Sequence, residues 1–405
     1  MKEDRNTKIF KLLQFVSYPV FWQPVLFLFL TIEKSLPASQ ALLLTSIYSL
    51  AVVFLEIPTG AVADKLSRKQ SGALGYFLKG LGLFLLPFLS SFPSMVGAMV
   101  ITALGESLTS GSIESLMYDS LADKKDTKQF KKIFAFSRTL LHAAMALYML
   151  LGGIIGEYNL SIPLYISFPF YCTAAILCLY FYEPKGVQTA RDGYDTNYLQ
   201  HIKKSFTKIF SKEGFSHGLG NLLIANFFIL GIISSLFWLS TPVLSDVGFG
   251  LALIGVFTAL FRVTKSIGSY LVTKFDDPND YRTMIITAII TMFSLALMGY
   301  FVAIDSILFG ILIVVLFGIL YAIQSFYQAN NIQLLNDKVE SIERATINSI
   351  QSVFMRLYEF SILPFVGLFL EGGNSSGGLY LLALLTGIGV FILLINRSRI
   401  VRNAQ

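Results

Sequence analysis

Twelve apolar runs, each long enough to cross a lipid bilayer, limit most strongly what this chain can fold into. A helix needs about 20 consecutive apolar residues to span a bilayer. Hydrophobic residues fill 54% of the 405 positions and charged residues only 14%, whereas soluble domains carry roughly 25% charged residues. The sequence therefore predicts an all-α integral membrane protein. We expect its spans to begin near Ile9, Ala38, Ser71, Pro93, Ile133, Ile162, Leu219, Phe249, Thr283, Ser306, Ala345 and Leu379.

The longest polar segment divides these spans into six and six. It runs from Glu183 to about His217. We predict an N-terminal six-helix bundle over residues 1–182, a cytoplasmic central loop over 183–217 and a C-terminal six-helix bundle over 218–405. Apolar residues at helical spacing within the loop leave two interpretations open: an amphipathic helix on the membrane surface, or a plain tethering linker.

The distribution of basic residues determines the predicted orientation. With both termini in the cytoplasm, 25 of the 31 lysines and arginines fall in cytoplasmic segments, five fall within spans and only Lys34 lies outside. Cytoplasmic loops carry the excess of Lys and Arg in membrane proteins. We therefore predict a multi-pass protein of the plasma membrane with both termini cytoplasmic. The net charge of +6 is attributed to topology and to contact with anionic membrane lipid, and not to nucleic acid.

The loop between the second and third spans carries the most specific motif of the chain. It reads Gly60-Ala-Val-Ala-Asp-Lys-Leu-Ser-Arg-Lys69, in which Asp64 is an acid among bases. The loop resembles the motif Gly-x-Leu-Ala-Asp-Arg-x-Gly-Arg-Lys of the major facilitator superfamily of transporters. The resemblance implies the major facilitator fold, with twelve transmembrane helices in two pseudo-symmetric six-helix bundles. The chain keeps Gly60, Ala63, Asp64, Arg68 and Lys69, has Lys65 for Arg, and departs from the motif at Val62 and Ser67.

The same resemblance implies a cytoplasmic gate. In the family, the Asp of the motif caps the start of the eleventh span, and an Arg of the motif pairs with an acid at the end of the fourth span. Here Asp119 stands at that end and suits Arg68, while Asp64 would meet the helix start near Ala345, where the helix dipole favours an anion. The residues assigned to this gate are Glu56, Gly60, Asp64, Arg68 and Asp119.

Nine charged residues fall inside predicted spans, and each is a functional candidate because a charge in hydrocarbon is costly. In the family, spans 1, 4, 7 and 10 line the central cavity and spans 2, 5, 8 and 11 flank it. By that arrangement only Lys79 falls on a supporting helix, about two turns from the cytoplasm, where its side chain is expected to snorkel to the surface. The nine residues are Glu56, Lys79, Glu106, Glu114, Arg138, Arg262, Lys265, Arg356 and Glu359.

The fourth span offers the best acid for proton coupling. Glu106 falls near the bilayer midplane, and no partner is expected at its depth in its own half. An acid in a poorly solvated cavity can gain and lose a proton near neutral pH, so we assign proton coupling to Glu106. The alternative is a structural carboxyl held by Ser107, Ser110 or a residue of the first span. The other proton-coupling candidates are Glu114, His142 and Glu359.

Glu114 and Arg138 lie at similar depth on neighbouring spans and are expected to form an ion pair. The pair is either a structural contact or part of the substrate cavity, for which Arg138 is a candidate. His142 falls at about the same depth.

Four charges fall near mid-depth in the C-terminal half. Arg356 and Glu359 are three residues apart and share a helix face, so they partly neutralise each other. The cations Arg262 and Lys265 remain. Two interpretations stay open: these cations bind an anionic group of a substrate, or they pair across the cavity with Glu106.

Aromatic and amide side chains on the predicted cavity helices suit an amphipathic organic ligand, because rings stack and amides orient a ligand without requiring a fixed charge. The alternative is hydrogen bonding between helices of the bundle. Together with the cations above, the predicted substrate-cavity residues are Tyr18, Trp22, Gln23, Arg138, Asn226, Arg262, Lys265, Tyr321, Gln324 and Arg356.

These observations predict a secondary active transporter that works by alternating access. The chain is similar to the drug:proton antiporter branch, which implies proton-coupled export of small amphipathic organic compounds. It departs from that branch at Ser107, where the branch carries Arg, and at Tyr148-Met149, where it carries Gly-Pro. The alternative is uptake or facilitated transport of an organic anion or sugar-like solute, and a remote one is a membrane sensor or scaffold. We predict no enzymatic activity, no cofactor and no metal site, and a monomer that binds a small molecule and protons.

Overall fold

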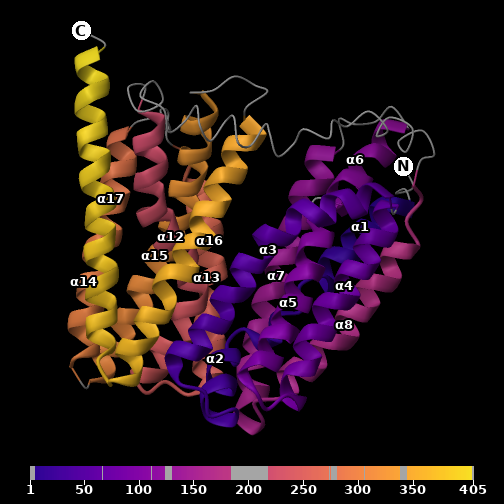
Figure 1. Ribbon diagram of the computed structural model, residues 1–405, viewed down its shortest axis with the longest axis horizontal. Helices are drawn as coiled ribbons and strands as arrows, with labels where there is room; N and C mark the ends of the chain where they lie inside the picture. The colour runs from indigo at the N-terminus through magenta and orange to yellow at the C-terminus, as the bar shows by residue number, and fades with distance from the viewer. Residues whose placement is uncertain are drawn as a thin grey trace. The chain divides into compact units, whose positions relative to one another are not determined.

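In the computed structural model, the described part of the chain consists of helices joined by short turns (Figure 1). The structure describes residues 5–65, 67–110, 112–123, 130–183, 218–272, 274, 281–304, 306–337 and 344–403. The predicted central loop and its possible surface helix lie outside this range, apart from Glu183. Within α3 the side chains of Gly60 and Asp64 also lie outside the description.

The helices supply twelve apolar segments long enough to cross a membrane in the described part of the chain, which confirms the predicted all-α membrane fold. The first span, Arg5–Glu33, is built from α1 (Arg5–Val16), η1 (Val20–Trp22), α2 (Leu26–Leu28) and η2 (Phe29–Glu33). The next five contain α3 (Ala38–Lys65), α4 (Arg68–Leu85) with η3 (Leu86–Phe88), α5 (Phe92–Thr109) with α6 (Ser112–Asp123), α7 (Phe130–Tyr158) and α8 (Ile162–Leu179). The last six contain α12 (Leu219–Asp246), α13 (Leu251–Val272), α14 (Tyr281–Val302), α15 (Ile307–Asp337), α16 (Arg344–Glu371) and α17 (Ser375–Asn403).

The chain forms two compact units that exchange two short segments. Unit 1 comprises Met1–Leu36, Ile47–Tyr194 and Gly250–Ala259, and unit 2 comprises Pro37–Ser46, Asp195–Phe249 and Leu260–Gln405. The start of α3 therefore belongs to unit 2, and the start of α13 belongs to unit 1. The division predicted from the sequence, at the central loop, assigns each of these two segments to the other half of the chain.

Glycines let α4 approach two neighbouring helices of unit 1 closely. A side chain at Gly75 would meet Thr109 and the backbone of Gly105 on α5. One at Gly80 would meet Tyr171 on α8, on the other side of α4. Small residues allow backbones to approach within a membrane, where packing replaces the hydrophobic effect as the force between helices. The consequence is that α4 lies tightly between α5 and α8.

The first span is interrupted between α1 and η1, at the segment Ser17-Tyr18-Pro19. Pro19 has no N–H with which to bond the carbonyl of Phe15. The hydroxyl of Tyr148 on α7 donates to that carbonyl instead, at 2.6 Å. The Pro19 carbonyl accepts from Ser167 on α8 at 2.9 Å. Neighbouring helices thus satisfy the backbone groups that the interruption leaves open, as a lipid environment requires.

The fourth span is interrupted between α5 and α6. The carbonyl of Leu108, close to the end of α5, accepts from the hydroxyl of Ser112 at 2.9 Å and from that of Ser71 on α4 at 3.1 Å. In both interruptions, side-chain hydroxyls donate to the backbone carbonyls that the break leaves open. Two spans of unit 1 therefore contain non-helical backbone.

Candidate functional site

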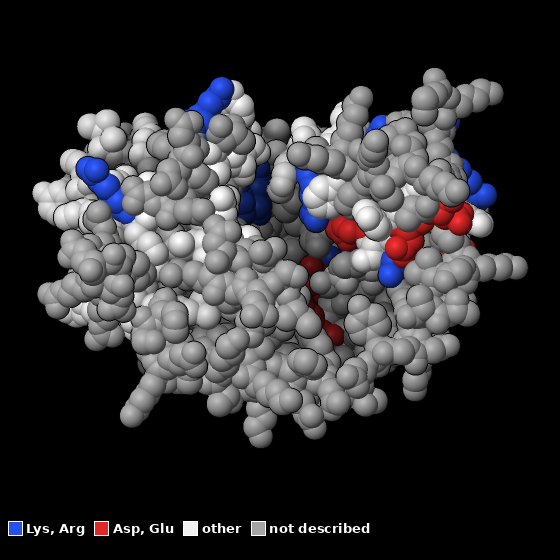
Figure 2. All heavy atoms as spheres, turned by 90° about the horizontal axis from the view of Figure 1, so that it is seen from above, with Lys and Arg blue, Asp and Glu red and all other residues white. Residues whose placement is uncertain are grey.

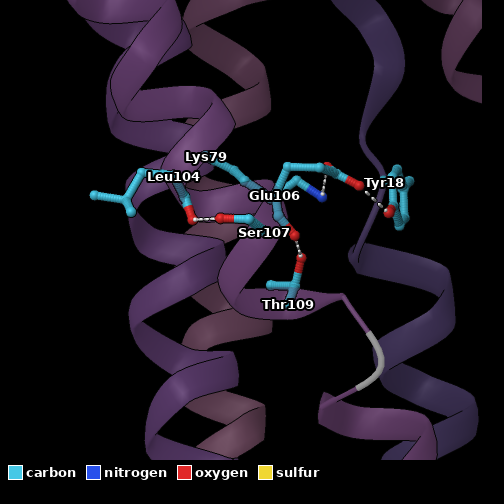
Figure 3. Close-up of polar contacts among 6 residues, drawn as sticks. All are labelled: Tyr18, Lys79, Leu104, Glu106, Ser107 and Thr109. Atoms are coloured by element: carbon cyan, nitrogen blue, oxygen red, sulfur yellow. Dashed lines mark hydrogen bonds and ion pairs between the residues drawn. The ribbon is translucent and has the colours of Figure 1, made fainter. Parts of the chain in front are cut away.

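An ion pair lies at the interior of unit 1. The Nζ atom of Lys79 on α4 is 2.5 Å from Oε2 of Glu106 on α5. The hydroxyl of Tyr18 donates to the other carboxylate oxygen of Glu106 at 2.8 Å, so the two side chains hold the carboxylate between them (Figure 3). We call Lys79, Glu106 and Tyr18 the Lys79 site. The Lys79 side chain is 2% exposed and that of Glu106 is 21% exposed.

This geometry corrects two expectations from the sequence. Lys79 does not snorkel to the membrane surface, because its ammonium is buried against Glu106. Glu106 has a partner in its own half after all. Of the alternatives for a held carboxyl, a residue of the first span does hold it, namely Tyr18. Ser107 does not contact the carboxylate in this way, since its hydroxyl donates to the Leu104 carbonyl at 3.1 Å (Figure 3).

The local sequence explains why these three groups meet. Gly75, Lys79 and Gly82 stand at positions i, i+4 and i+7 of α4 and so share one helix face. A side chain at Gly82 would meet Ala98 and Thr102, so this face packs against α5. Lys79 therefore faces a helix and not lipid. Tyr18 lies in the interruption of the first span, beside the non-helical backbone.

Three tyrosine rings surround the ammonium of Lys79. Its Nζ lies 3.9 Å from the ring centroid of Tyr18, 5.5 Å from that of Tyr76 and 5.9 Å from that of Tyr171. Cations within about 6 Å of an aromatic face are attracted by the ring quadrupole. The predicted cavity residue Trp22 interacts with Tyr171. The neighbouring Gln23, another predicted cavity residue, is buried.

The predicted pair of Glu114 and Arg138 is also formed, between α6 and α7. Arg138 Nη2 donates to Glu114 Oε1 at 3.1 Å, and the two side chains are 43% and 32% exposed. The pair is thus much more open to its surroundings than the Lys79 site. His142 follows Arg138 by one turn on α7. Proton coupling by Glu114 or His142 stays a prediction.

At the predicted cytoplasmic gate, Arg68 forms an ion pair with Asp119, as the family motif implied. The backbone N–H of Arg68 also donates to Glu183 Oε1 at 2.9 Å, a contact that the sequence did not reveal. Figure 2 shows acidic and basic side chains gathered on the right of this view. Glu56 is exposed on α3. The contact predicted for Asp64 falls outside the described side chains, so the gating role itself stays a prediction.

The departure from the family motif at Ser67 has a structural reason. The Ser67 hydroxyl accepts from the backbone N–H of Gln70 at 3.3 Å, and the Gln70 side chain accepts from the Ser67 N–H at 3.2 Å. This reciprocal arrangement is a capping box, which satisfies free N–H groups at the start of a helix. Ser67 therefore begins α4 at the point where the family pattern has glycine.

In unit 2, Arg262 on α13 is buried against aromatic rings. Its guanidinium carbon lies 5.2 Å from the ring centroid of Phe237 on α12, and the side chain is 9% exposed. The neighbouring Phe261 stacks on Tyr321 of α15, with centroids 5.1 Å apart and ring planes at 17°. Lys265, one turn further on, interacts electrostatically with Arg262. We call Arg262, Lys265, Phe237 and Tyr321 the Arg262 site.

Within the part of the chain that the structure describes, neither Arg262 nor Lys265 forms an ion pair with an acid. Glu106, the partner considered from the sequence, is paired with Lys79 instead. On α16 the backbone carbonyl of Glu359 accepts from Ser46 of α3 at 3.0 Å, within unit 2. The mutual neutralisation of Arg356 and Glu359 stays a prediction.

The predicted cavity residue Asn226 takes part in a network between helices of unit 2. Its amide nitrogen donates to Asn331 at 2.6 Å, and its amide oxygen accepts from Tyr327 at 3.0 Å. Asn331 in turn donates to Gln351 at 2.6 Å. These contacts correspond to the helix–helix alternative. Gln324 differs, because its buried Oε1 has no hydrogen-bond partner among the described residues.

The sequence reasoning missed Lys79 as a site residue because it judged depth and span number alone. The signal that was available is the glycine spacing: a lysine four residues after Gly75 and three before Gly82 lies on the face that packs on another helix. It also missed Tyr76 and Tyr171, which need the packed structure to be found.

Comparisons with known proteins agree with this architecture. The sequence model of the Major Facilitator Superfamily matches residues 12–358. The chain is 27% identical over 254 residues to the uncharacterized MFS-type transporter YxaM of Bacillus subtilis (strain 168), a match that covers 61% of each chain. Its structure is similar to that of the nucleoside transporter NupG, with a TM-score of 0.80 and 14% identity over 98% of this chain and 99% of that one. A D-xylose-proton symporter gives a TM-score of 0.68 and 15% identity, over 95% of this chain and 97% of that one.

Proposed function

The chain belongs to the Major Facilitator Superfamily, and on that premise we propose that it couples the movement of protons to the transport of small amphipathic organic compounds. As a family member with twelve membrane spans, it is a multi-pass secondary transporter that takes a small-molecule substrate. The proposal adds the coupling ion, the kind of substrate and, from the resemblance to drug:proton antiporters, export in exchange for protons.

The observation that carries the proposal is the Lys79 site. Glu106 is 21% exposed while Lys79 is 2% exposed, so a proton has access to the acid of the pair and not to the base. When Lys79 and Glu106 are both charged and in contact, the pair as a whole is electrically neutral. A proton that binds Glu106 removes one of the two charges, and the buried ammonium is then left with the tyrosine rings alone. Proton binding and the opening of the pair are therefore linked.

Tyr18 links the protonation of Glu106 to the interrupted backbone of the first span. Its hydroxyl donates to Glu106, and the residue lies in the interruption of the first span. Interrupted helices supply the binding sites in many secondary transporters, because non-helical backbone is tolerated in a membrane only where it is buried in protein or lines a cavity. A change in the charge of Glu106 therefore acts directly on the non-helical segment of a predicted cavity helix.

Proton flux into proteoliposomes tests the proposal. A pH-sensitive dye trapped inside would report proton movement when amphipathic compounds are added on one side of an imposed pH gradient. We expect wild-type protein to move protons in response to at least one compound, and Glu106→Gln to lose the response. Because Glu106→Gln leaves Lys79 without its counter-ion, the double variant Lys79→Met/Glu106→Gln is measured beside it.

Asp246→Asn is the matched control, since Asp246 is an exposed acid at the end of α12. Unchanged substrate-dependent proton flux in the Glu106 variants would overturn the assignment of Glu106. The sign of the flux separates export in exchange for protons from uptake together with protons.

A further inference from the structure

Arg262 is a buried cation in the middle of a membrane span, and its electrostatic environment within unit 2 is incomplete. It lies 11 residues from one end of α13 and ten from the other, as the bounds Leu251–Val272 show, which places it about 15 Å from each end of the helix. Its side chain is nine-tenths buried. In the described part of the chain, it lies against an aromatic ring and forms no ion pair with an acid.

A second positive charge makes the position more costly. Lys265 is three residues from Arg262 and shares its helix face, where like charges repel. A charge in hydrocarbon is normally paired, and an unpaired one marks an ion or substrate pathway. In unit 1 the same problem is solved internally, because Lys79 has Glu106 as its counter-ion. In unit 2 the described residues form no ion pair with Arg262, which favours a counter-charge supplied by a bound molecule.

We propose that the Arg262 site binds the carboxylate of an aromatic organic acid, which is the amphipathic substrate of the transporter. This inference rests on the proposed transport function and specifies its substrate class. The depth of Arg262 favours a small molecule over a lipid headgroup, since headgroups lie at the membrane surface and Arg262 lies near mid-span.

The neighbouring groups determine how such an acid binds. Phe237 lies against the Arg262 guanidinium. A carboxylate binds a guanidinium in the plane of its nitrogens, where two parallel N–H···O bonds form. Tyr321 is held in place by its stack on Phe261, and its ring offers an apolar wall. Gln324, one turn after Tyr321, contributes a buried oxygen with no partner among the described residues, which accepts a hydrogen bond from a ligand N–H or O–H.

Binding to the purified protein tests this inference without a proton gradient. Isothermal titration would compare benzoate with three probes: benzamide, which has the ring without the charge, benzylamine, which has the opposite charge, and acetate, which has the charge without the ring. We expect benzoate to bind most tightly. Arg262→Gln should weaken benzoate binding by about tenfold to a hundredfold, the range for a charge-assisted hydrogen bond, and leave benzamide binding unchanged. Arg282→Gln, an exposed arginine of the same unit, is the matched control and should bind benzoate like wild type.

Arg262→Lys keeps the measurement informative if Arg262→Gln does not fold. It retains the charge but not the planar pair of donors, so the preference for benzoate over benzamide should fall and not vanish. Equal binding of benzoate and benzamide by wild-type protein would overturn the inference, as would unchanged benzoate affinity in the Arg262 variants. Loss of benzoate binding in nanodiscs of anionic lipid, with binding kept in zwitterionic ones, would assign the site to lipid instead. Unchanged proton coupling in the Glu106 variants, together with intact benzoate binding, would refute the coupling residue and leave the anion site standing.

Discussion

The two units each bury a basic side chain within a membrane span, and they treat its charge in opposite ways. In unit 1, Lys79 has a carboxylate at 2.5 Å and a tyrosine ring centroid at 3.9 Å. In unit 2, Arg262 has a phenylalanine ring centroid at 5.2 Å and forms no ion pair with an acid in the described part of the chain. Burial of a charge is costly in both places. One unit contains the counter-charge in its own fold, and in our proposal the other leaves that role to a ligand.

The largest effect should follow from removal of one partner of the internal pair. Glu106→Gln leaves Lys79 as a buried charge without compensation, which costs about 3–5 kcal/mol. Removal of both charges in Lys79→Met/Glu106→Gln should restore most of this stability, since apolar replacement of a buried pair is often neutral or stabilising. Thermal unfolding in detergent checks both variants. A single variant as stable as wild type would show that the pair does not compensate the Lys79 charge, and the contrast between the units would disappear.

A carboxylate introduced near the Arg262 site should give unit 2 an internal counter-charge, as unit 1 has for Lys79. Gln324→Glu changes little in shape and places an acid one turn after Tyr321, which interacts with Arg262. We expect benzoate affinity to fall by at least about tenfold, the factor that ~1.4 kcal/mol represents, because a resident acid repels or replaces the ligand. Titration calorimetry measures the change, with Gln333→Glu, an exposed position on the opposite face of the same helix, as the control. Benzoate affinity equal to that of wild type would separate Gln324 from the Arg262 site.

Removal of a single hydroxyl should weaken the internal pair without breaking it. Tyr18→Phe keeps the ring over Lys79 and deletes the hydrogen bond to Glu106, worth about 1.5 kcal/mol when the acceptor is charged. Substrate-dependent proton flux should slow, while the protein remains folded. Tyr158→Phe, an exposed tyrosine at the end of α7, serves as the comparison. If Tyr18→Phe left the flux unaltered, the connection between Glu106 and the first span would have to be abandoned.

The smallest effect is expected at the exposed pair of unit 1. Glu114 and Arg138 are 32% and 43% exposed, and open ion pairs contribute about 0–1 kcal/mol. Glu114→Gln should therefore change the free energy of unfolding by less than about 1 kcal/mol, as denaturant unfolding can measure. A loss as large as that of Glu106→Gln would mean that burial is not the cause of the difference between the pairs.

Much of the fold and several local contacts were predictable from the sequence. Apolar length fixes the number of spans, because a helix of a given composition either crosses the bilayer or does not. The pairs Arg68–Asp119 and Glu114–Arg138 followed from the family motif and from depth along neighbouring spans, and both are formed. Such contacts depend on position along the membrane normal, which a sequence specifies well.

The Lys79 site was not predicted, for a physical reason. Whether Lys79 reaches Glu106 depends on the distance between α4 and α5, and that distance is set by Gly75 and Gly105 and not by hydropathy. The interruption at Pro19 was missed as well, since a proline inside an apolar run marks a break only if neighbours such as Tyr148 satisfy the open carbonyl. The exchange of the first parts of α3 and α13 between the units likewise depends on packing that periodicity does not record.

Lys79, Glu106 and Tyr18 lie in the same unit, which limits how their distances can change during a transport cycle. All three belong to unit 1, and a rigid body keeps its internal distances when it rotates. A rocking motion of the whole unit therefore leaves the pair as it was, whichever side of the membrane the substrate faces. Only a bend within the unit, at the Ser17-Tyr18-Pro19 segment or between α5 and α6, changes these distances. In the proposed proton-coupled cycle, these two interruptions would therefore set how tightly transport is coupled to protons. A variant with a stiffer interruption would still transport substrate but would move fewer protons with it.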